Sequence, residues 1–433
     1  MSPREREVAD LVAQGLTNRE IAKKLFLSER TVDGHLEHLR EKLEVNTRAQ
    51  IATWVVRQET TATSVSEPMA AVPARAPTRT LMAKPQIWMA TALVLAVLAA
   101  GVGLLRLTAP PPPTITTIAG ATVDLTQYPG GGSTGDGGPA IHAQLSRPSD
   151  VVVAADGTIY IADYGNGVVR AVSGGIITGF TGASNKKPAM HGDFAADVSI
   201  GDPSNVTVDS SGNVYVLTDL AGSLQVWMVS AHVNRLSRLA ILGPSVTTEY
   251  WQASGGGLAV AKDGTLYIAD RAHNRVFKLI SGQLSPFAGT GAEGYSGDGG
   301  AARNATLDSP IGLALDVQGN LYIADALNNR IRKVDSRGTI TTVAGSGEIG
   351  DGGDGGPAQQ ASFSIPYGVA VARDGTLVVS DAGNNRLREV TPGQEILAVT
   401  ASSQDGFAGD GLPAIAARLS APEGVAFDAH GNL

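Results

Sequence analysis

The stretch "GLALDVQGNLYIADALNNRIRKV", residues 312–334, contains most of one folding unit. Apolar residues alternate with other residues in "GLAL" and in "LYIAD", as they do in strands that bury one face. The two runs are joined by a turn at G-N, which predicts a β-hairpin. "NNRIRKV" continues as a third strand, and "ITTVAGSG" at 340–347 supplies a fourth. The stretch therefore predicts a small antiparallel sheet of four strands.

The same unit recurs along most of the chain. Each copy carries the hairpin, as in "DVVVAADGTIYIAD" and "GVAVARDGTLVVSD", and the copies align on a shared turn glycine. Four short antiparallel strands that repeat every 52–56 residues predict an all-β propeller. The aligned glycines are Gly157, Gly212, Gly264, Gly319, Gly375 and Gly431.

The units "NLYIADALNNRIRKV" and "LVVSDAGNNRLREV" resemble NHL repeats, and no G-H…W-D pair of the WD40 type recurs. The resemblance implies about six NHL-type blades over residues 108–433. "TITTIAG", residues 114–120, lacks inner strands of its own, so we expect it to be the outer strand that closes the last blade. Residues 421–433 stop before that blade's second and third strands are complete. We therefore expect an incomplete last blade and a C-terminally truncated sequence.

Two sets of aspartates recur in the propeller repeats. The strand-end set pairs in register with arginines, which is better explained by ion pairs within each blade than by catalysis. The second set, in "GDGG"-type loops, lacks the alternating oxygen ligands of a calcium loop, so we favour Asx-type turns. The strand-end set is Asp163, Asp219, Asp270, Asp325 and Asp381, with Arg170, Arg275, Arg330 and Arg386. The loop set is Asp136, Asp298, Asp354 and Asp410.

Metal and cofactor chemistry find little support in the composition. The chain has no cysteine, which excludes disulfides, thiolate metal sites and a cysteine nucleophile. The propeller histidines fall at unrelated repeat positions, so a histidine metal centre is not expected. We predict no catalytic residue, no cofactor and no metal site, and hence that the protein is not an enzyme. The histidines are His142, His191, His232, His273 and His430.

Residues 1–58 have a different architecture. Capping boxes begin helices at "SPRE", "TNRE" and "TRAQ", and "SERT" offers a further cap. Between these caps apolar residues recur at helical spacing, for example Val12, Ile21 and Leu36. The connections are short, so the pattern predicts a small all-α domain with a helix-turn-helix at its centre.

The segment "SPREREVADLVAQGLTNREIAKKLFLSERTVDGHLEHLREKLEVNTRAQIATWV" resembles the LuxR-type DNA-binding domain of bacterial transcription regulators over essentially all of residues 1–57. The resemblance implies that the third helix, about Glu29 to Leu43, enters the major groove of double-stranded DNA, and that the fourth forms a dimer surface. The protein is therefore expected to be a homodimer on DNA. The implied base-reading face is Thr31, Asp33, Gly34, Glu37 and His38. The implied phosphate partners are Arg19, Lys23, Lys24, Arg30, Arg40, Lys42 and Arg48.

Charge qualifies this resemblance. Asp33 and Glu37 stand where family members often have lysine or another polar residue, and carboxylates on a groove-facing helix repel phosphate. Residues 1–58 hold ten Lys and Arg against nine Asp and Glu, so binding that is not sequence-specific should be weak. A helical interaction module that no longer binds DNA is the alternative. The sequence begins within the family motif's first turn, which leaves room for an upstream domain.

A long apolar segment follows the helical domain. "IWMATALVLAVLAAGVGLL", residues 87–105, has no charged residue over 19 positions, and a helix of that length matches the hydrocarbon thickness of a bilayer. We predict one transmembrane helix at residues 87–107. Residues 59–86 are rich in Pro, Ala and Thr without apolar periodicity, which predicts a disordered linker. Ala92, Ala96 and Ala100 form a small-residue stripe, which is more simply ordinary alanine usage than a dimer surface.

Charge asymmetry predicts the orientation of this helix. Arg75, Arg79 and Lys84 precede the span, and Arg106 follows it. The positive-inside rule places the N-terminus in the cytoplasm and the propeller outside. Residues 108–433 hold nineteen Lys and Arg against thirty Asp and Glu, so this part is a poor nucleic-acid binder.

The sequence favours a membrane-anchored, single-pass transcriptional regulator of the cell membrane. Its cytoplasmic domain would bind DNA, and its extracytoplasmic propeller would sense an unknown ligand or protein. The alternative is an extracytoplasmic NHL propeller that serves as an adhesion or protein-interaction scaffold, with a helical domain that no longer regulates genes. A lyase-type propeller enzyme is the third hypothesis, because function on this scaffold resides in its loops.

Overall fold

The computed structural model describes residues 112–121, 134–182, 186–220, 223–244, 256–401 and 403–433, together with five single residues nearer the N-terminus. The chain divides into two compact units, Met1–Leu107 and Thr108–Leu433. In the first unit the described residues are helical, and Val12, Ile21 and Leu36 are buried, as their place in the apolar pattern predicts. The single residues are Val12, Ile21, Lys24, Leu36 and Lys42.

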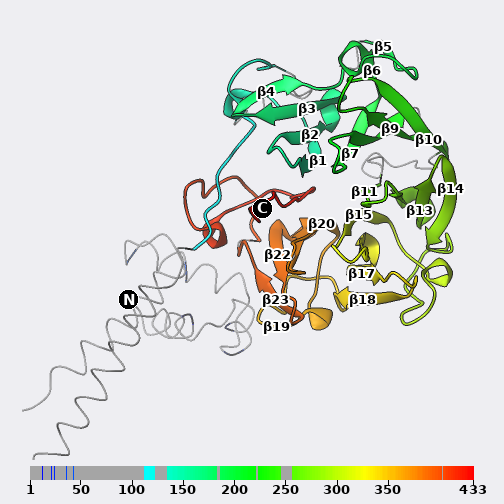
Figure 1. Cartoon of the computed structure of the whole chain (residues 1–433). Coiled ribbons are helices and arrows are strands. Elements are labelled where there is room, and N and C mark those ends of the chain that lie inside the picture. Colours follow the sequence, from blue (N-terminus) through cyan, green and yellow to red (C-terminus); the bar gives the residue numbers. More distant parts are fainter. Residues whose placement is uncertain are drawn as a thin grey trace, which may run out of the picture. The chain divides into compact units, whose positions relative to one another are not determined.

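The second unit contains five four-stranded antiparallel blades arranged around a centre, a β-propeller (Figure 1). In each blade the strands follow one another in chain order. The first two blades are β1 (Pro148–Val153), β2 (Ile159–Asp163), β3 (Val168–Ser173), β4 (Ile176–Gly179), and β7 (Asp202–Val208), β8 (Val214–Leu220), β9 (Ser223–Val229), β10 (Leu236–Pro244). The third is β11 (Leu258–Val260), β12 (Leu266–Asp270), β13 (Arg275–Ile280) and β14 (Gln283–Ala288). The fourth is β15 (Pro310–Leu315), β16 (Leu321–Asp325), β17 (Arg330–Val334) and β18 (Ile340–Ala344). The fifth is β20 (Pro366–Val371), β21 (Leu377–Asp381), β22 (Arg386–Val390) and β23 (Glu395–Ala398).

Short elements lie in the loops between these strands. β5 and β6 form a small parallel pair, and β19 extends the fifth blade beside β23. The short strands are β5 (Lys187–Pro188), β6 (Val198–Ser199) and β19 (Gly356–Pro357). The 3-10 turns are η1 (Ala140–His142), η2 (Tyr164–Asn166), η3 (Ala195–Asp197), η4 (Arg271–His273), η5 (Ala302–Asn304), η6 (Ala326–Asn328), η7 (Ala358–Gln360), η8 (Ala382–Asn384) and η9 (Ala414–Ala416).

The hairpin turns explain why the repeat folds as it does. Gly319 has φ +81°, a left-handed conformation that glycine adopts without strain. Beside it, the carboxylate of Asp316 accepts hydrogen bonds from the backbone N–H of Gln318 (3.0 Å) and of Asn320 (2.8 Å). Local chemistry thus fixes the turn, and the alternating pattern then sends one face of each strand into the core.

The core lies between successive blades. One cluster joins Tyr322, Ala324 and Ile331 of the fourth blade to Val369 and Val379 of the fifth. Equivalent clusters of buried aliphatic residues join each earlier blade to the next. Because each blade buries its apolar faces on its neighbours, stability depends on the ring and not on isolated sheets.

The expectation of about six blades is wrong in one respect, because five blades form sheets. Among the described residues 403–433 there is no strand. Ile115 nevertheless takes the expected outer-strand position: its N–H donates to the Leu412 carbonyl (3.2 Å), and its carbonyl accepts from Gly411 N (2.8 Å). Ile340, in the outer strand of the fourth blade, makes the same pair of bonds with its own loop: it accepts from Gly299 N (2.8 Å) and donates to the Gly300 carbonyl (3.0 Å).

Residues 421–427 lie at an inner-strand position, between β20 and β1 (Figure 1). The Glu423 carbonyl accepts a hydrogen bond from Ser380 Oγ, and Gly424 packs so closely on Asp150 that a Cβ would collide with it. The first and fourth strands of a blade are separated by the width of two strands, too far to pair directly. For this reason the two segments occupy a sixth position without forming a sheet.

The expected membrane span at residues 87–107 lies outside the described residues, as does the linker at residues 59–86. Across the part of the chain that the structure describes, no helix is both long enough and apolar enough to cross a bilayer.

Candidate functional site

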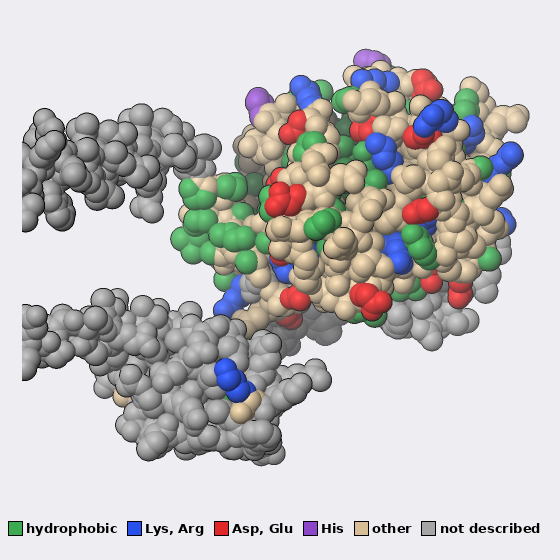
Figure 2. Space-filling model, turned by 90° about the horizontal axis from the view of Figure 1, so that it is seen from below, with side chains coloured by type: hydrophobic (Ala, Val, Ile, Leu, Met, Phe, Trp, Pro, Cys, Tyr) green, Lys and Arg blue, Asp and Glu red, His purple; other side chains and the backbone are tan. Residues whose placement is uncertain are grey.

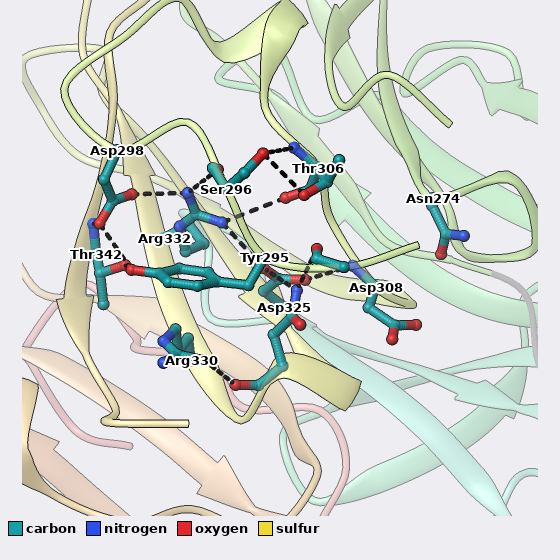
Figure 3. A network of polar contacts seen from close by, with 12 residues as sticks. Asn274, Tyr295, Ser296, Asp298, Thr306, Asp308, Asp325, Arg330, Arg332 and Thr342 are labelled. Atoms are coloured by element: carbon teal, nitrogen blue, oxygen red, sulfur yellow. Dashed lines mark hydrogen bonds and ion pairs between the residues drawn. The ribbon is translucent and has the colours of Figure 1, made fainter. Parts of the chain in front are cut away.

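Asp325 and its arginine form the polar network at the end of the fourth blade (Figure 3). The buried carboxylate of Asp325 accepts from the backbone N–H of Asp308 (2.7 Å) and from Asn328 Nδ2 (2.9 Å). Arg332 Nη1 lies 3.1 Å from Asp325, and the Arg332 side chain is fully buried. Burial raises the pKa of Asp325 to about 6, and the hydrogen bonds and Arg332 only partly oppose it.

Arg332 also reaches the "GDGG" loop (Figure 3). Its Nη2 lies 2.7 Å from Asp298, which accepts in addition from Thr342 N (3.0 Å). Partial burial favours the neutral acid, but the bonds from Thr342 and the charge of Arg332 outweigh it and hold the pKa of Asp298 below its ordinary value. A buried arginine thus clamps a half-exposed loop to the end of a strand.

The first and fifth blades repeat this clamp. Arg170 lies 2.6 Å from Asp136 and 3.7 Å from Asp163. Arg388 lies 2.7 Å from Asp354 and 3.6 Å from Asp381. The recurrence in three blades supports the predicted structural role and gives no sign of catalysis.

The predicted pairing of Arg170 with Asp163 is confirmed by their 3.7 Å separation, whereas the predicted arginine partners in the third, fourth and fifth blades are wrong. Arg330 pairs with Asp325 in backbone register, as predicted, but the ion pair is made by Arg332, two residues further along the strand. Arg330 instead stacks on Tyr295, 3.7 Å from the ring centroid, and donates to the Asn328 carbonyl (2.9 Å). Arg332 lies two residues further along β17 on the same face, where its side chain is fully buried and reaches the carboxylate of Asp325. In the third blade, Asp270 binds His273 Nδ1 (2.8 Å) in place of an arginine.

The Asx-turn interpretation of the loop aspartates is also wrong for three of them. The carboxylates of Asp136, Asp298 and Asp354 bind arginine side chains. No group of three or more metal-ligating side chains occurs among the described residues. These loops are therefore part of the scaffold.

A second cluster, which sequence reasoning missed, surrounds the propeller axis. The inner strands enclose a central cavity of about 190 Å³, lined by aliphatic side chains and by Asp150, Asn205 and Tyr367. Asp150 accepts from Val206 N (3.0 Å), and Asn205 accepts from Leu258 N (2.8 Å), so each side chain bridges to the next blade. Asp150 and Tyr367 line this cavity, and four further residues interact electrostatically with these two or with one another. The six together form the mouth cluster: Arg147, Asp150, Tyr164, Arg271, Tyr367 and Glu423.

The repeat contained a signal for this cluster. Where the fourth and fifth blades have Gly312 and Gly368, the first has Asp150 and the second Asn205. A Cβ at Gly312 would collide with the Tyr367 carbonyl of the next blade. A strand does not need a carboxylate at this repeat position, so its presence points to another role. Comparison of the blades would therefore have singled out Asp150.

Burial shifts the pKa values of several ionisable groups in the mouth cluster. Burial raises the pKa of Asp150 to about 7, although Val206 N donates to it. Burial raises the pKa of Glu423 to about 7 as well, against the charges of Arg147 and Arg271. Burial lowers the pKa of Arg271. Perturbed groups around a cavity are typical of binding sites.

The structure describes two of the twelve predicted DNA-binding residues. Lys24 and Lys42 are helical and exposed, as phosphate partners would be. On the propeller face seen in Figure 2, acidic and basic side chains are interspersed. The other ten predicted residues, Arg19, Lys23, Arg30, Thr31, Asp33, Gly34, Glu37, His38, Arg40 and Arg48, lie outside the described residues.

Comparison with known proteins supports both resemblances. The family described as bacterial regulatory proteins, luxR family, matches residues 1–55. The NHL repeat matches residues 145–171, and the teneurin NHL domain matches residues 286–352.

Individual relatives match one part of the chain each. The nitrate/nitrite response regulator protein NarL of Escherichia coli (strain K12) is 42% identical over 55 residues, 13% of this chain and 26% of NarL. Teneurin-4 of Homo sapiens is 30% identical over 226 residues, 46% of this chain and 8% of teneurin-4. A solved structure of a protein of unknown function from Bacteroides thetaiotaomicron VPI-5482 has a TM-score of 0.49 and 17% identity, and the match covers 67% of this chain and 66% of that one. The chain thus spans a small part of the length of these curated relatives.

Proposed function

We propose that this protein is a membrane-anchored transcriptional regulator whose cytoplasmic LuxR-type domain binds DNA and whose extracytoplasmic propeller senses a ligand. The luxR family match over residues 1–55 carries the proposal. The exposure of Lys24 and Lys42 on helices agrees with phosphate contacts. In this proposal the domain binds as a homodimer, because two half-sites need two recognition helices.

The apolar segment at 87–107 supports anchoring, and the arginines and lysine before it support a cytoplasmic N-terminus. The mouth cluster supports ligand sensing, since it joins a cavity to the ionisable side chains of Arg147, Arg271 and Glu423, which form no ion pair among the described residues. A signal would pass across the membrane as a change in the spacing or dimer state of the DNA-binding domains.

Genome-wide mapping of DNA sites occupied by the full chain in its own host tests the regulator. Discrete sites should appear, and their occupancy should be lost when Lys23 and Lys24 are both replaced by glutamate. Occupancy spread evenly over the genome would instead support the scaffold alternative, for which the NHL match to teneurin-4 is the specific observation.

A pair of fusions tests the membrane topology. A reporter active only in the cytoplasm should work when joined after Gln58 and stay silent when joined after Gly347. Activity at both positions would place the propeller in the cytoplasm and remove the anchoring step from the proposal.

A further inference from the structure

Two arginines at the cavity mouth have no anionic partner among the described residues. Arg271 begins η4, directly after the buried Asp270 at the end of β12. Its half-buried guanidinium makes no hydrogen bond or ion pair within the described part of the chain. Arg147, just before β1, is exposed and lies 5.3 Å from the ring centroid of Tyr164. A partly buried guanidinium without an acceptor is costly, so an anion placed beside it is favourable.

Glu423 lies in the field of both arginines without pairing with either. No ion pair within 4 Å joins its carboxylate to Arg147 or Arg271 in the described structure, although each guanidinium lowers its pKa. Burial nevertheless keeps that pKa near 7, which means that the half-buried carboxyl is poorly compensated when it ionises. Neither guanidinium therefore has Glu423 as a partner at ion-pair distance.

The other charged groups of the mouth cluster and its surroundings form no ion pair with the two arginines in the described structure. Asp150 is engaged by Val206 N (3.0 Å) on the neighbouring blade. Asp202, at the start of β7, and Asp219, near the end of β8, act electrostatically on Tyr164. Tyr367 lines the cavity and interacts electrostatically with Arg271. Within the mouth cluster, the charged side chains that the described structure leaves without a hydrogen-bond or ion-pair partner are thus two guanidiniums and one carboxyl, and the surplus of one positive charge favours an anionic ligand.

We propose that the cavity mouth binds a small organic oxyanion, a carboxylate or a phosphate ester, between Arg147 and Arg271 and in competition with Glu423. The oxyanion receives charge-assisted hydrogen bonds from the guanidiniums. Its carbon skeleton enters the central cavity, where polar groups are exposed beside aliphatic side chains and whose volume of about 190 Å³ is below the ~300–1,000 Å³ typical of sites for drug-sized ligands. This inference rests on the proposed sensing role and names the class of ligand.

Competition between Glu423 and the ligand predicts how the affinity for the anion changes with pH. When Glu423 is protonated, the ligand is the only anion beside the two guanidiniums. When Glu423 is ionised, its negative charge weakens the binding of the ligand. With a pKa of about 7, roughly 0.9 of Glu423 is protonated at pH 6 and roughly 0.09 at pH 8. Affinity for the anion should therefore fall about tenfold between these pH values.

The experiment is calorimetric titration of the full chain in detergent micelles with succinate and with inorganic phosphate, at pH 6 and pH 8. Either anion should show saturable binding at pH 6, and the preferred probe there distinguishes a carboxylate ligand from a phosphate ligand. Succinate should bind about tenfold more weakly at pH 8; phosphate gains a second charge over this range, so its affinity is compared at pH 6 alone. Ethylammonium serves as the cationic counterpart and should not bind.

Three variants assign the site. Arg271→Gln should weaken binding of the anion at least tenfold. Glu423→Gln should make the affinity for succinate equal at both pH values. Arg337→Gln is the matched control, because its guanidinium is 85% exposed and pairs with Asp335 away from the mouth. If Arg271→Gln melts earlier than the wild type, Arg147→Gln takes its place with the same expected loss.

Absence of saturable binding of both anions, unchanged affinity in the arginine variants, or preferential binding of ethylammonium would overturn the proposed site. The same preparations are assayed for binding to the mapped DNA sites. Discrete DNA sites without anion binding would overturn this inference alone, and anion binding without discrete sites would overturn the regulator alone.

Discussion

Replacing Arg332 with methionine should destabilise the propeller by about 2–4 kcal/mol at pH 7. Methionine keeps much of the aliphatic volume but removes a guanidinium that lies 3.1 Å from Asp325 and 2.7 Å from Asp298. It also removes the hydrogen bond from Arg332 to the Ser296 carbonyl (3.0 Å). Because Ser296 is exposed and water can replace the guanidinium, the loss of this hydrogen bond costs about 0.5–1.5 kcal/mol.

The rest of the effect is electrostatic and depends on pH. The pKa of Asp325 is about 6 in the folded protein, against an ordinary value of 3.8. Between these values the folded chain holds a proton that the unfolded chain has released, so stability falls as pH rises through this window. Arg332 lowers the pKa of Asp325, so without it the folded pKa rises further and the carboxyl stays protonated to higher pH. This extends the loss by at most one further pKa unit, about 1.4 kcal/mol.

Urea denaturation of the full chain in detergent, followed by tryptophan fluorescence, to which the buried Trp227 of the propeller contributes, measures the difference. The deficit of Arg332→Met should be about 1.4 kcal/mol smaller at pH 5 than at pH 7, because Asp325 is then protonated in wild type and variant alike. Arg330→Met is the matched control, since Arg330 lies one pleat away and has no ion pair among the described residues; its cost should be below about 1 kcal/mol. Equal losses in the two variants, or a deficit unaffected by pH, would refute the clamp.

Three further predictions use other parts of the chain. Lys23→Glu with Lys24→Glu should weaken binding to all DNA sequences alike and reduce its salt dependence; a sequence-selective loss with an unchanged salt slope in fluorescence titrations would contradict a phosphate role. Asp150→Asn should flatten the fall in melting temperature between about pH 4 and pH 7, because burial raises the folded pKa to about 7 and the neutral amide cannot titrate; an unchanged profile would exclude this carboxyl as its source. Gly312→Ala should cost about 1–3 kcal/mol by collision with the neighbouring backbone, whereas Gly352→Ala, with open space around it, should be nearly neutral, and thermal melts that rank them the other way would dispose of the close-packed axis.

Most of the scaffold follows from local sequence pattern. The hairpins depend on alternation over a few residues and on turn glycines such as Gly319, and both act within a dozen positions of the chain. Repetition of that unit then requires stacking around a ring, because no blade can bury both faces alone. The outer-strand role of Ile115 was also predictable, since its segment repeats the pattern of Ile340. The helical domain was recognisable for a similar reason, through caps and apolar periodicity.

Side-chain partnerships and the mouth cluster depended on tertiary structure. Sequence register paired Asp325 with Arg330, yet the carboxylate takes Arg332, because pleat depth and the ring of Tyr295 decide which guanidinium reaches it. Arg147, Arg271 and Glu423 are separated by more than a hundred residues along the chain and meet only when the ring closes. Pattern within a strand specifies which way a residue faces, whereas its charged neighbours come from another strand of the blade, as for Asp325, or from other blades, as in the mouth cluster. Sequence therefore determined the blade, and closure of the ring decided what surrounds its axis.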